Sequence, residues 1–129
     1  KDATGELERI NFLKEKVKKD FIFISGDDLS FLDYMERGGC GVISVTANVK
    51  PDLMHDICHN ILNGNIEESR DINNKLISLH QAMFIDSNPI PVKWLLNYLG
   101  LIEQGIRLPL IELDKKYHTK LVKALESIK

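Results

Sequence analysis

The sequence has little cysteine and no excess of charge of one sign. Its 129 residues include two cysteines, too few for the disulfide framework of a small secreted protein. Lys and Arg total 17 against 19 Asp and Glu, which gives a formal net charge of −2. Surfaces that bind nucleic acid or membranes usually carry a basic excess. These absences predict a cytoplasmic protein that binds neither nucleic acid nor a membrane.

Long hydrophobic runs are also missing. No apolar stretch approaches the roughly 20 residues that span a bilayer, and no charged-then-apolar signal segment opens the chain. What remains is typical of a globular protein, since 43% of the residues are hydrophobic and 28% are charged. The sequence begins at Lys1 rather than at Met. We therefore expect it to be part of a longer chain.

The first half of the sequence alternates helix and strand patterns. Apolar residues recur at spacings of three and four over residues 4–19, which predicts an amphipathic helix. Residues 21–25 and 41–45 are short runs rich in β-branched or aromatic residues, typical of strands buried on both faces. A helix is predicted between them at residues 29–35. Short connections in such an alternation indicate an α/β fold with parallel strands.

The second half carries helix patterns only. Pro51 stands at the first turn of one predicted helix, and a long helix is predicted over residues 65–83. Two more are predicted at residues 91–99 and 114–128. The sequence therefore divides near Gly64, with α/β units before it and helices after it.

Ligands of parallel α/β proteins bind beyond the carboxyl ends of the strands. That rule points to residues 25–28 and 44–48, which follow the two predicted strands. Lys1 occupies the same position relative to the first predicted helix, so it is expected at a third strand end. A lysine in a low-dielectric site can lose its proton and attack a ketone as a Schiff-base nucleophile. The alternative is an ordinary solvated lysine, which is the common state at a chain end.

Two clusters of potential metal ligands have simpler explanations. His55 and His59 are spaced to share one helical face, with Cys58 beside them, but no third ligand stands at a recognised zinc spacing. We therefore favour surface histidines. Asp27 and Asp28 could hold a divalent metal, yet capping of the following helix is the more common role of such residues.

Two further features are also interpreted as structural. Residues 88–91, Asn-Pro-Ile-Pro, predict a stiff turn that shapes a loop. The single tryptophan, Trp94, is predicted to belong to the core rather than to a ligand platform.

Five sequence blocks stand in a fixed order along the chain. They are Lys-Asp-Ala-Thr-Gly at 1–5, Ser-Gly-Asp-Asp at 25–28, Gly-Val-Ile-Ser-Val-Thr-Ala-Asn-Val at 41–49, Asn-Pro-Ile-Pro-Val-Lys at 88–93 and Arg-Leu-Pro-Leu at 107–110. In order and spacing these blocks resemble the dihydrodipicolinate synthase family, part of the broader N-acetylneuraminate lyase and class I aldolase superfamily. The resemblance implies a TIM (β/α)8 barrel followed by a C-terminal α-helical domain. Residues 1–63 would be the last strand–helix units of an incomplete barrel, and residues 64–129 the helical domain.

The resemblance also implies a site and a reaction. Lys1 falls on the lysine that forms an imine with pyruvate, and Gly26 lies beside the bound pyruvate. The backbone carbonyl of Ile43 lies near the lysine, and Asn88 lies in a loop that flanks the barrel mouth. The enamine then adds to aspartate semialdehyde, in the biosynthesis of diaminopimelate and lysine. No metal or organic cofactor is expected, because the protonated imine is itself the electron sink.

The resemblance implies that part of the machinery lies before Lys1, including the tyrosine that relays protons in the family. A complete barrel needs about 250 residues, so we expect a truncated chain that is inactive alone and a protein that forms a homo-oligomer. Two alternatives stay open. One is a related pyruvate-dependent aldolase of the N-acetylneuraminate lyase type, and the other is a non-catalytic remnant that serves as an assembly module.

Overall fold

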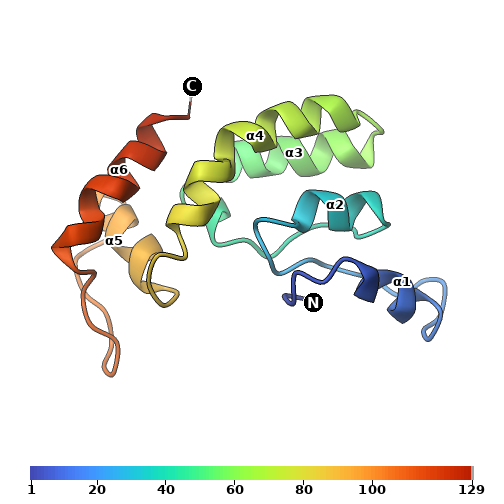
Figure 1. Ribbon diagram of the computed structural model, residues 1–129, viewed down its shortest axis with the longest axis horizontal. Coiled ribbons are helices and arrows are strands. Elements are labelled where there is room, and N and C mark those ends of the chain that lie inside the picture. Colours follow the sequence, from blue (N-terminus) through green and yellow to red (C-terminus); the bar gives the residue numbers. More distant parts are fainter. Residues whose placement is uncertain (129) are drawn as a thin grey trace.

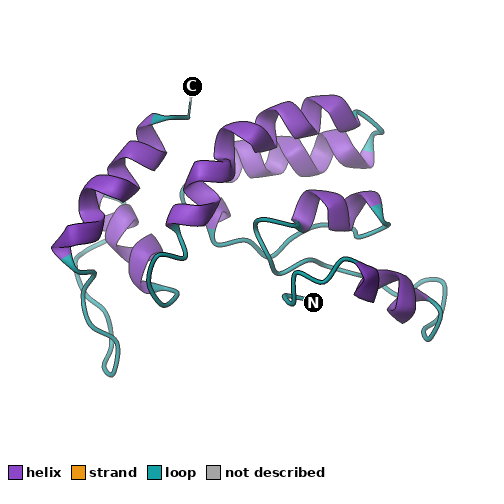
Figure 2. Cartoon of the chain, in the orientation of Figure 1, coloured by secondary structure: helices purple, strands orange, loops and turns teal. Residues whose placement is uncertain are grey.

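The computed structural model describes residues 1–128 of the chain, and helices dominate that range (Figure 2). None of the described helices is both long enough and apolar enough to span a membrane. In chain order the elements are α1 Glu8–Lys14, α2 Phe31–Glu36, the 3-10 turn η1 Thr46–Asn48, α3 Pro51–Leu62, α4 Ile66–Ala82, α5 Ile90–Tyr98, the 3-10 turn η2 Lys115–Tyr117 and α6 His118–Glu126.

The predicted strands at 21–25 and 41–45 are wrong as extended strands, but their parallel direction is confirmed. Ser25 forms isolated parallel bridges with Asp2 on one side and with Val42 on the other. Three short segments therefore pair side by side, each over about one residue. The bridge to the third segment is closed by two backbone hydrogen bonds, from the Ser25 N–H to the Gly41 carbonyl and from the Ile43 N–H to the Ser25 carbonyl, both 2.9 Å.

Missing partners explain why these runs are not full strands. Phe21 and Ile22 keep 56% and 64% of their surface exposed, although their pattern is typical of strands covered on both faces. Among residues 1–128 nothing pairs with them as a strand. An apolar run of this kind becomes a strand only when neighbouring backbone supplies its hydrogen bonds.

The predicted helices are confirmed, but the first of them is less than half as long as predicted. The helix predicted over residues 4–19 is shorter and spans Glu8–Lys14, and it buries Ile10 completely. Pro51 begins α3 as predicted. Gly64, with φ +83°, reverses the chain in a backbone conformation that favours glycine. As a result α3 and α4 pack along each other (Figure 1).

Two groups of buried apolar side chains hold the described chain together. The larger core joins α2 through α6 and includes side chains from both sides of Gly64. Its completely buried members include Phe31, Ile57, Leu76, Leu79, Leu95 and Leu121. The smaller group consists of Ile10, Phe23 and Tyr34. The division into residues 1–63 and 64–129 stays a prediction, and residue 129 lies outside the described residues.

Candidate functional site

A cavity of about 380 Å³ lies where the paired segments meet the start of α5. Lys1, Gly26, Ile43 and Asn88 all line it. The structure therefore brings together the four residues that the sequence analysis selected, although 87 positions separate the first of them from the last.

Backbone pairing fixes Lys1 next to Gly26. The Gly26 N–H donates to the Asp2 carbonyl at 2.7 Å, and the Asp2 N–H donates to the Ile24 carbonyl at 2.9 Å. A Cβ atom at position 26 would collide with Cε of Lys1 and would stand 2.8 Å from the Cβ of Ala3. Glycine is thus required for the close approach of the Lys1 side chain to this backbone.

Two of the other predicted site residues offer backbone or polar groups to the cavity. The Ile43 N–H is used in pairing, whereas its carbonyl oxygen accepts no hydrogen bond from residues 1–128. Asn88 is exposed at the turn before α5. Lys1 is exposed as well, and no salt bridge within the described range includes it. Its amine therefore has no neutralising partner among these residues.

The turn at residues 44–48 forms the next part of the wall, through Ser44, Val45 and Asn48. Ser44 Oγ accepts the Ala47 N–H at 2.9 Å, and Asn48 Nδ2 donates to the Val45 carbonyl at 3.0 Å. These bonds are local, so they shape the turn but do not fix its place in the molecule.

The two aspartates after Gly26 have different roles. Asp27 Oδ2 accepts the N–H and the hydroxyl of Ser30, at 2.9 and 2.6 Å, in the turn that leads into α2. The predicted capping of α2 is not confirmed, because its N-cap residue is Ser30 and no side chain caps the helix. Asp27 stabilises the turn before the helix. Asp28 instead turns inward, with 1% of its surface exposed, and its Oδ2 accepts the backbone N–H groups of Val45 and Thr46, both at 3.0 Å.

A buried imidazole continues from this contact. His80 of α4 is fully buried, with Nδ1 2.7 Å from the Thr46 hydroxyl and Nε2 3.3 Å from Asn73 Oδ1. Burial lowers the pKa of His80 below its usual 6.5, while the charges of Asp28 and Asp27 oppose that shift.

The histidine pair that suggested zinc lies on the exposed side of α3. His55 and His59 stack with ring centroids 5.8 Å apart, and burial raises the pKa of the Cys58 thiol. Across residues 1–128, no group of three or more His, Cys, Asp or Glu side chains is arranged to hold a metal ion.

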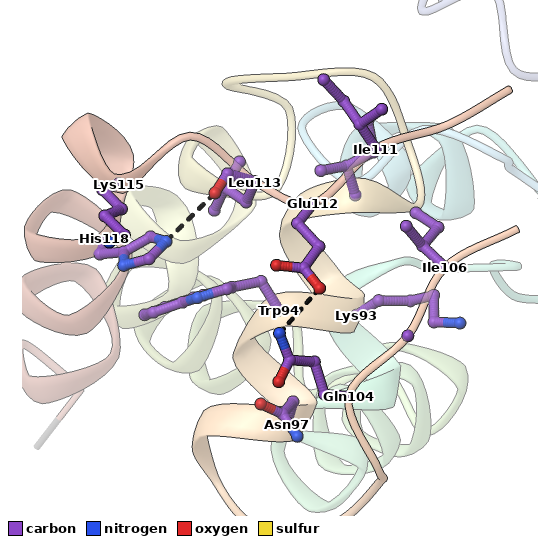
Figure 3. Close-up of a pocket in the computed structure, with 12 residues that line it drawn as sticks. Lys93, Trp94, Asn97, Gln104, Ile106, Ile111, Glu112, Leu113, Lys115 and His118 are labelled. Carbon is purple, nitrogen blue, oxygen red and sulfur yellow. Dashed lines mark hydrogen bonds between the residues drawn. The ribbon is translucent and has the colours of Figure 1, made fainter. Parts of the chain in front are cut away.

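A second cavity, of about 240 Å³, lies between α5 and the chain that leads into α6 (Figure 3). Trp94 packs against the core, as predicted, but also lines this cavity, with its ring stacked on His118 at 4.1 Å and on Tyr98 at 5.5 Å. Gln104 and Glu112 line it as well, and the Gln104 side-chain amide donates to the Glu112 carboxylate at 2.7 Å. None of the predicted site residues lines this cavity.

Sequence reasoning missed several residues of the first cavity and its support. Lys93 and Phe84 line the cavity, and only Lys93 stood inside a recognised block. His80 was not selected, although a signal existed: it stands among the apolar residues Leu76, Leu79 and Met83 of one helix. A histidine inside an apolar face requires a buried hydrogen-bond partner.

Together these features describe a mostly helical chain in which one exposed lysine lies against a glycine where three short segments pair in parallel. Comparison with known proteins gives the particular family. The sequence matches the dihydrodipicolinate synthetase family over residues 1–128. The chain belongs to this family.

Curated relatives support the match at high identity. The chain is 49% identical over 127 residues to the 4-hydroxy-tetrahydrodipicolinate synthase of Saccharophagus degradans, covering 98% of this chain and 44% of the relative. It is 50% identical over 125 residues to the synthase of Pseudomonas aeruginosa, covering 97% and 43%. The chain thus spans less than half the length of the curated relatives it matches.

Solved structures agree on the fold. The chloride-inhibited dihydrodipicolinate synthase from Acinetobacter baumannii, complexed with pyruvate, superposes with a TM-score of 0.94 at 41% identity, over 99% of this chain and 44% of that one. A dihydrodipicolinate synthase characterised as the first monomeric variant superposes with a TM-score of 0.92 at 38% identity, over 98% and 43%. The chain therefore has the fold of these enzymes over the matched part.

Proposed function

We propose that the chain is the C-terminal portion of a dihydrodipicolinate synthase, a lyase that condenses pyruvate with aspartate semialdehyde through a Schiff base on Lys1. The observation that carries the proposal is the single cavity lined by Lys1, Gly26, Ile43 and Asn88. Family membership and the superposition on a relative solved with pyruvate support it.

The proposed chemistry begins at the Nζ atom of Lys1. The unprotonated amine attacks the keto carbon of pyruvate, and water leaves to give an imine. Loss of a proton from the pyruvate methyl group then gives an enamine, with the protonated imine as the electron sink. The enamine carbon adds to the aldehyde carbon of aspartate semialdehyde. The amine of that substrate finally attacks the imine carbon, which closes the ring and releases Lys1.

The neighbouring groups have positioning roles in this proposal. Gly26 leaves room for the lysine chain and for pyruvate, because any Cβ there would fill the space. The free carbonyl oxygen of Ile43 accepts a hydrogen bond from the Lys1 amine or from its adducts, and the Asn88 amide supplies polar contacts in the same cavity. No metal or organic cofactor takes part.

We also propose that residues 1–63 are the last strand–helix units of a (β/α)8 barrel and that residues 64–129 are its C-terminal helical domain. The exposed apolar side chains of Phe12, Phe21 and Ile22, with 59%, 56% and 64% of their surface free, support this. The rest of a barrel would cover them and complete the strands. We further propose that the whole protein is a cytoplasmic homo-oligomer whose substrates are pyruvate and aspartate semialdehyde.

Reductive trapping tests the lysine assignment. The chain is joined to the N-terminal part of the Pseudomonas aeruginosa synthase, which supplies the rest of the barrel. The fusion is incubated with isotope-labelled pyruvate and borohydride, and the labelled atom is located by tandem mass spectrometry. We expect the label on Nζ of Lys1 and not on Lys93, which lines the same cavity and is the internal control. Label on Lys93 at equal yield would contradict the proposal.

Two further measurements separate the alternatives. The first measurement uses the chain completed by the missing barrel part of a relative. An aldolase of the N-acetylneuraminate lyase type would then cleave N-acetylneuraminate and would not condense pyruvate with aspartate semialdehyde. A non-catalytic assembly module would elute as a single oligomer in gel filtration and leave Lys1 unlabelled.

A further inference from the structure

A buried carboxylate ties the 44–48 turn to the body of the protein. Asp28 Oδ2 accepts two backbone N–H groups, from Val45 and Thr46 at 3.0 Å each, and lies 3.2 Å from the Thr46 hydroxyl. Charge-assisted bonds of this kind are about twice as strong as neutral ones. They fix the turn at its centre, which its own local bonds do not do.

The Thr46 hydroxyl extends this link to the large core. It lies 2.7 Å from Nδ1 of His80, and a hydroxyl can donate one hydrogen bond while accepting another. His80 sits on α4, and the edge of its ring meets the Phe31 ring, with centroids 6.0 Å apart. Asp28, Thr46 and His80 are all at least 99% buried. A continuous polar path therefore joins the turn to α4, where the His80 ring also packs against Phe31 of α2.

None of these three residues lines the cavity, but other residues of the 44–48 turn do. Ser44, Val45 and Asn48 of the turn line it, directly after Ile43. The path also leaves one buried atom, Asp28 Oδ1, without a hydrogen-bond partner among the described residues. Burial of an unpartnered carboxylate oxygen costs stability, so packing alone does not explain an aspartate at this position.

We propose that Asp28, Thr46 and His80 are positioning residues that hold the 44–48 turn, and with it the Ile43 carbonyl, at a fixed distance from Lys1. The effect on the chemistry at Lys1 rests on the proposed function, whereas the attachment of the turn does not depend on it. A misplacement of about 1 Å in a reacting site can cost about 10²-fold in rate.

Amide hydrogen exchange on the 129-residue chain tests the attachment without any substrate. In Asp28→Asn we expect the Val45 and Thr46 amides to exchange about 10-fold faster, because their acceptor loses its charge. The α3 and α4 amides should keep their protection. Asp33→Asn is the matched control, since that carboxylate lies on α2, is 47% exposed and pairs with Arg70. Unchanged exchange at Val45 and Thr46 in Asp28→Asn would overturn the proposal.

Thr46 supplies a second pair of variants in case Asp28→Asn disturbs the whole fold. Thr46→Val keeps the shape but removes the hydroxyl, whereas Thr46→Ser keeps the hydroxyl. We expect faster exchange across residues 44–48 in Thr46→Val and rescue in Thr46→Ser. Equal behaviour of the two variants would show that the hydroxyl link does not hold the turn.

Pyruvate trapping then measures the consequence at Lys1. In Asp28→Asn and Thr46→Val we expect the maximal trapping rate to fall by up to about 10²-fold. The pyruvate concentration that gives the half-maximal trapping rate should change less. A loose turn with an unchanged maximal rate would overturn the positioning role. These trapping rates are measured with the chain joined to the N-terminal part of the Pseudomonas aeruginosa synthase, which completes the barrel. If this fusion with the unmodified chain traps no pyruvate, the proposed function fails, whereas the exchange data still decide whether Asp28 holds the turn.

Discussion

The region before α3 and the helical region after it differ in the size of the core that each forms. Residues 1–48 have only a small buried group of their own, which consists of Ile10, Phe23 and Tyr34. Residues 51–128 share a core to which four helices contribute. The first region carries Lys1 and Gly26, so the proposed chemistry belongs to the part with less core.

Two sets of contacts connect the region before α3 to the helical region. Helix α2 inserts Phe31, Leu32 and Met35 into the large core, and the path from Asp28 to His80 ties the 44–48 turn to α4. The helical region therefore acts as the support on which the lysine end is placed.

The largest expected effect is on the free energy of unfolding, through the core of the helical region. Leu79→Ala removes a completely buried side chain and should lower the free energy of unfolding by about 2–5 kcal/mol. The control is Leu108→Ala, where 85% of the side chain is exposed and a change within about 0.5 kcal/mol is expected. Urea unfolding followed by circular dichroism measures both. Equal effects would contradict the contrast between core and surface.

A smaller effect is expected at the lysine end. Gly26→Ala drives a methyl group into the Lys1 side chain and Ala3, which should cost about 1–3 kcal/mol of overpacking strain and reduce pyruvate trapping. Gly41→Ala is the matched control, because a Cβ there meets nothing within 4 Å. If both glycine variants trap pyruvate equally well, the close approach of Lys1 to residue 26 has no functional meaning.

The smallest expected effect is on the pH dependence of the free energy of unfolding, through His80 in the link between the regions. Because burial lowers the pKa of folded His80 below the unfolded value of 6.5, only the unfolded chain takes up this proton as the pH falls below about 6.5. Stability due to His80 is therefore complete above that pH and is lost as the pH falls towards the folded pKa.

Urea midpoints at pH 7.5 and 5.5 test this dependence. His80→Gln should reduce the loss of stability between the two pH values, whereas His59→Gln, at an exposed position, should leave it unchanged. The same loss in both variants would show that His80 is not the group responsible.

The sequence predicted the helices better than the paired segments, for a physical reason. Helices such as α3 and α4 satisfy their backbone hydrogen bonds locally, so periodicity and a proline at the first turn suffice to locate them. Residues 21–25 satisfy theirs only through other segments, and the expected strand is reduced to one bridge at Ser25.

The candidate site shows the same limit. Lys1, Gly26, Ile43 and Asn88 were selected because strand ends and family blocks marked them, and the structure places them around one cavity. The path from Asp28 through Thr46 to His80 was not predicted. It joins residues 18 and 34 positions apart, and no periodic pattern records such a contact.

The most direct test of the central claim replaces the corresponding segment of the Pseudomonas aeruginosa synthase, which is 50% identical, with this chain. The assay measures condensation of pyruvate with aspartate semialdehyde by the chimera. We expect activity within about tenfold of that of the relative, and its loss in the chimera with Lys1→Arg, which keeps the charge but cannot form the imine. An intact, folded chimera that lacks activity, or one in which Lys1→Arg remains active, would contradict the account.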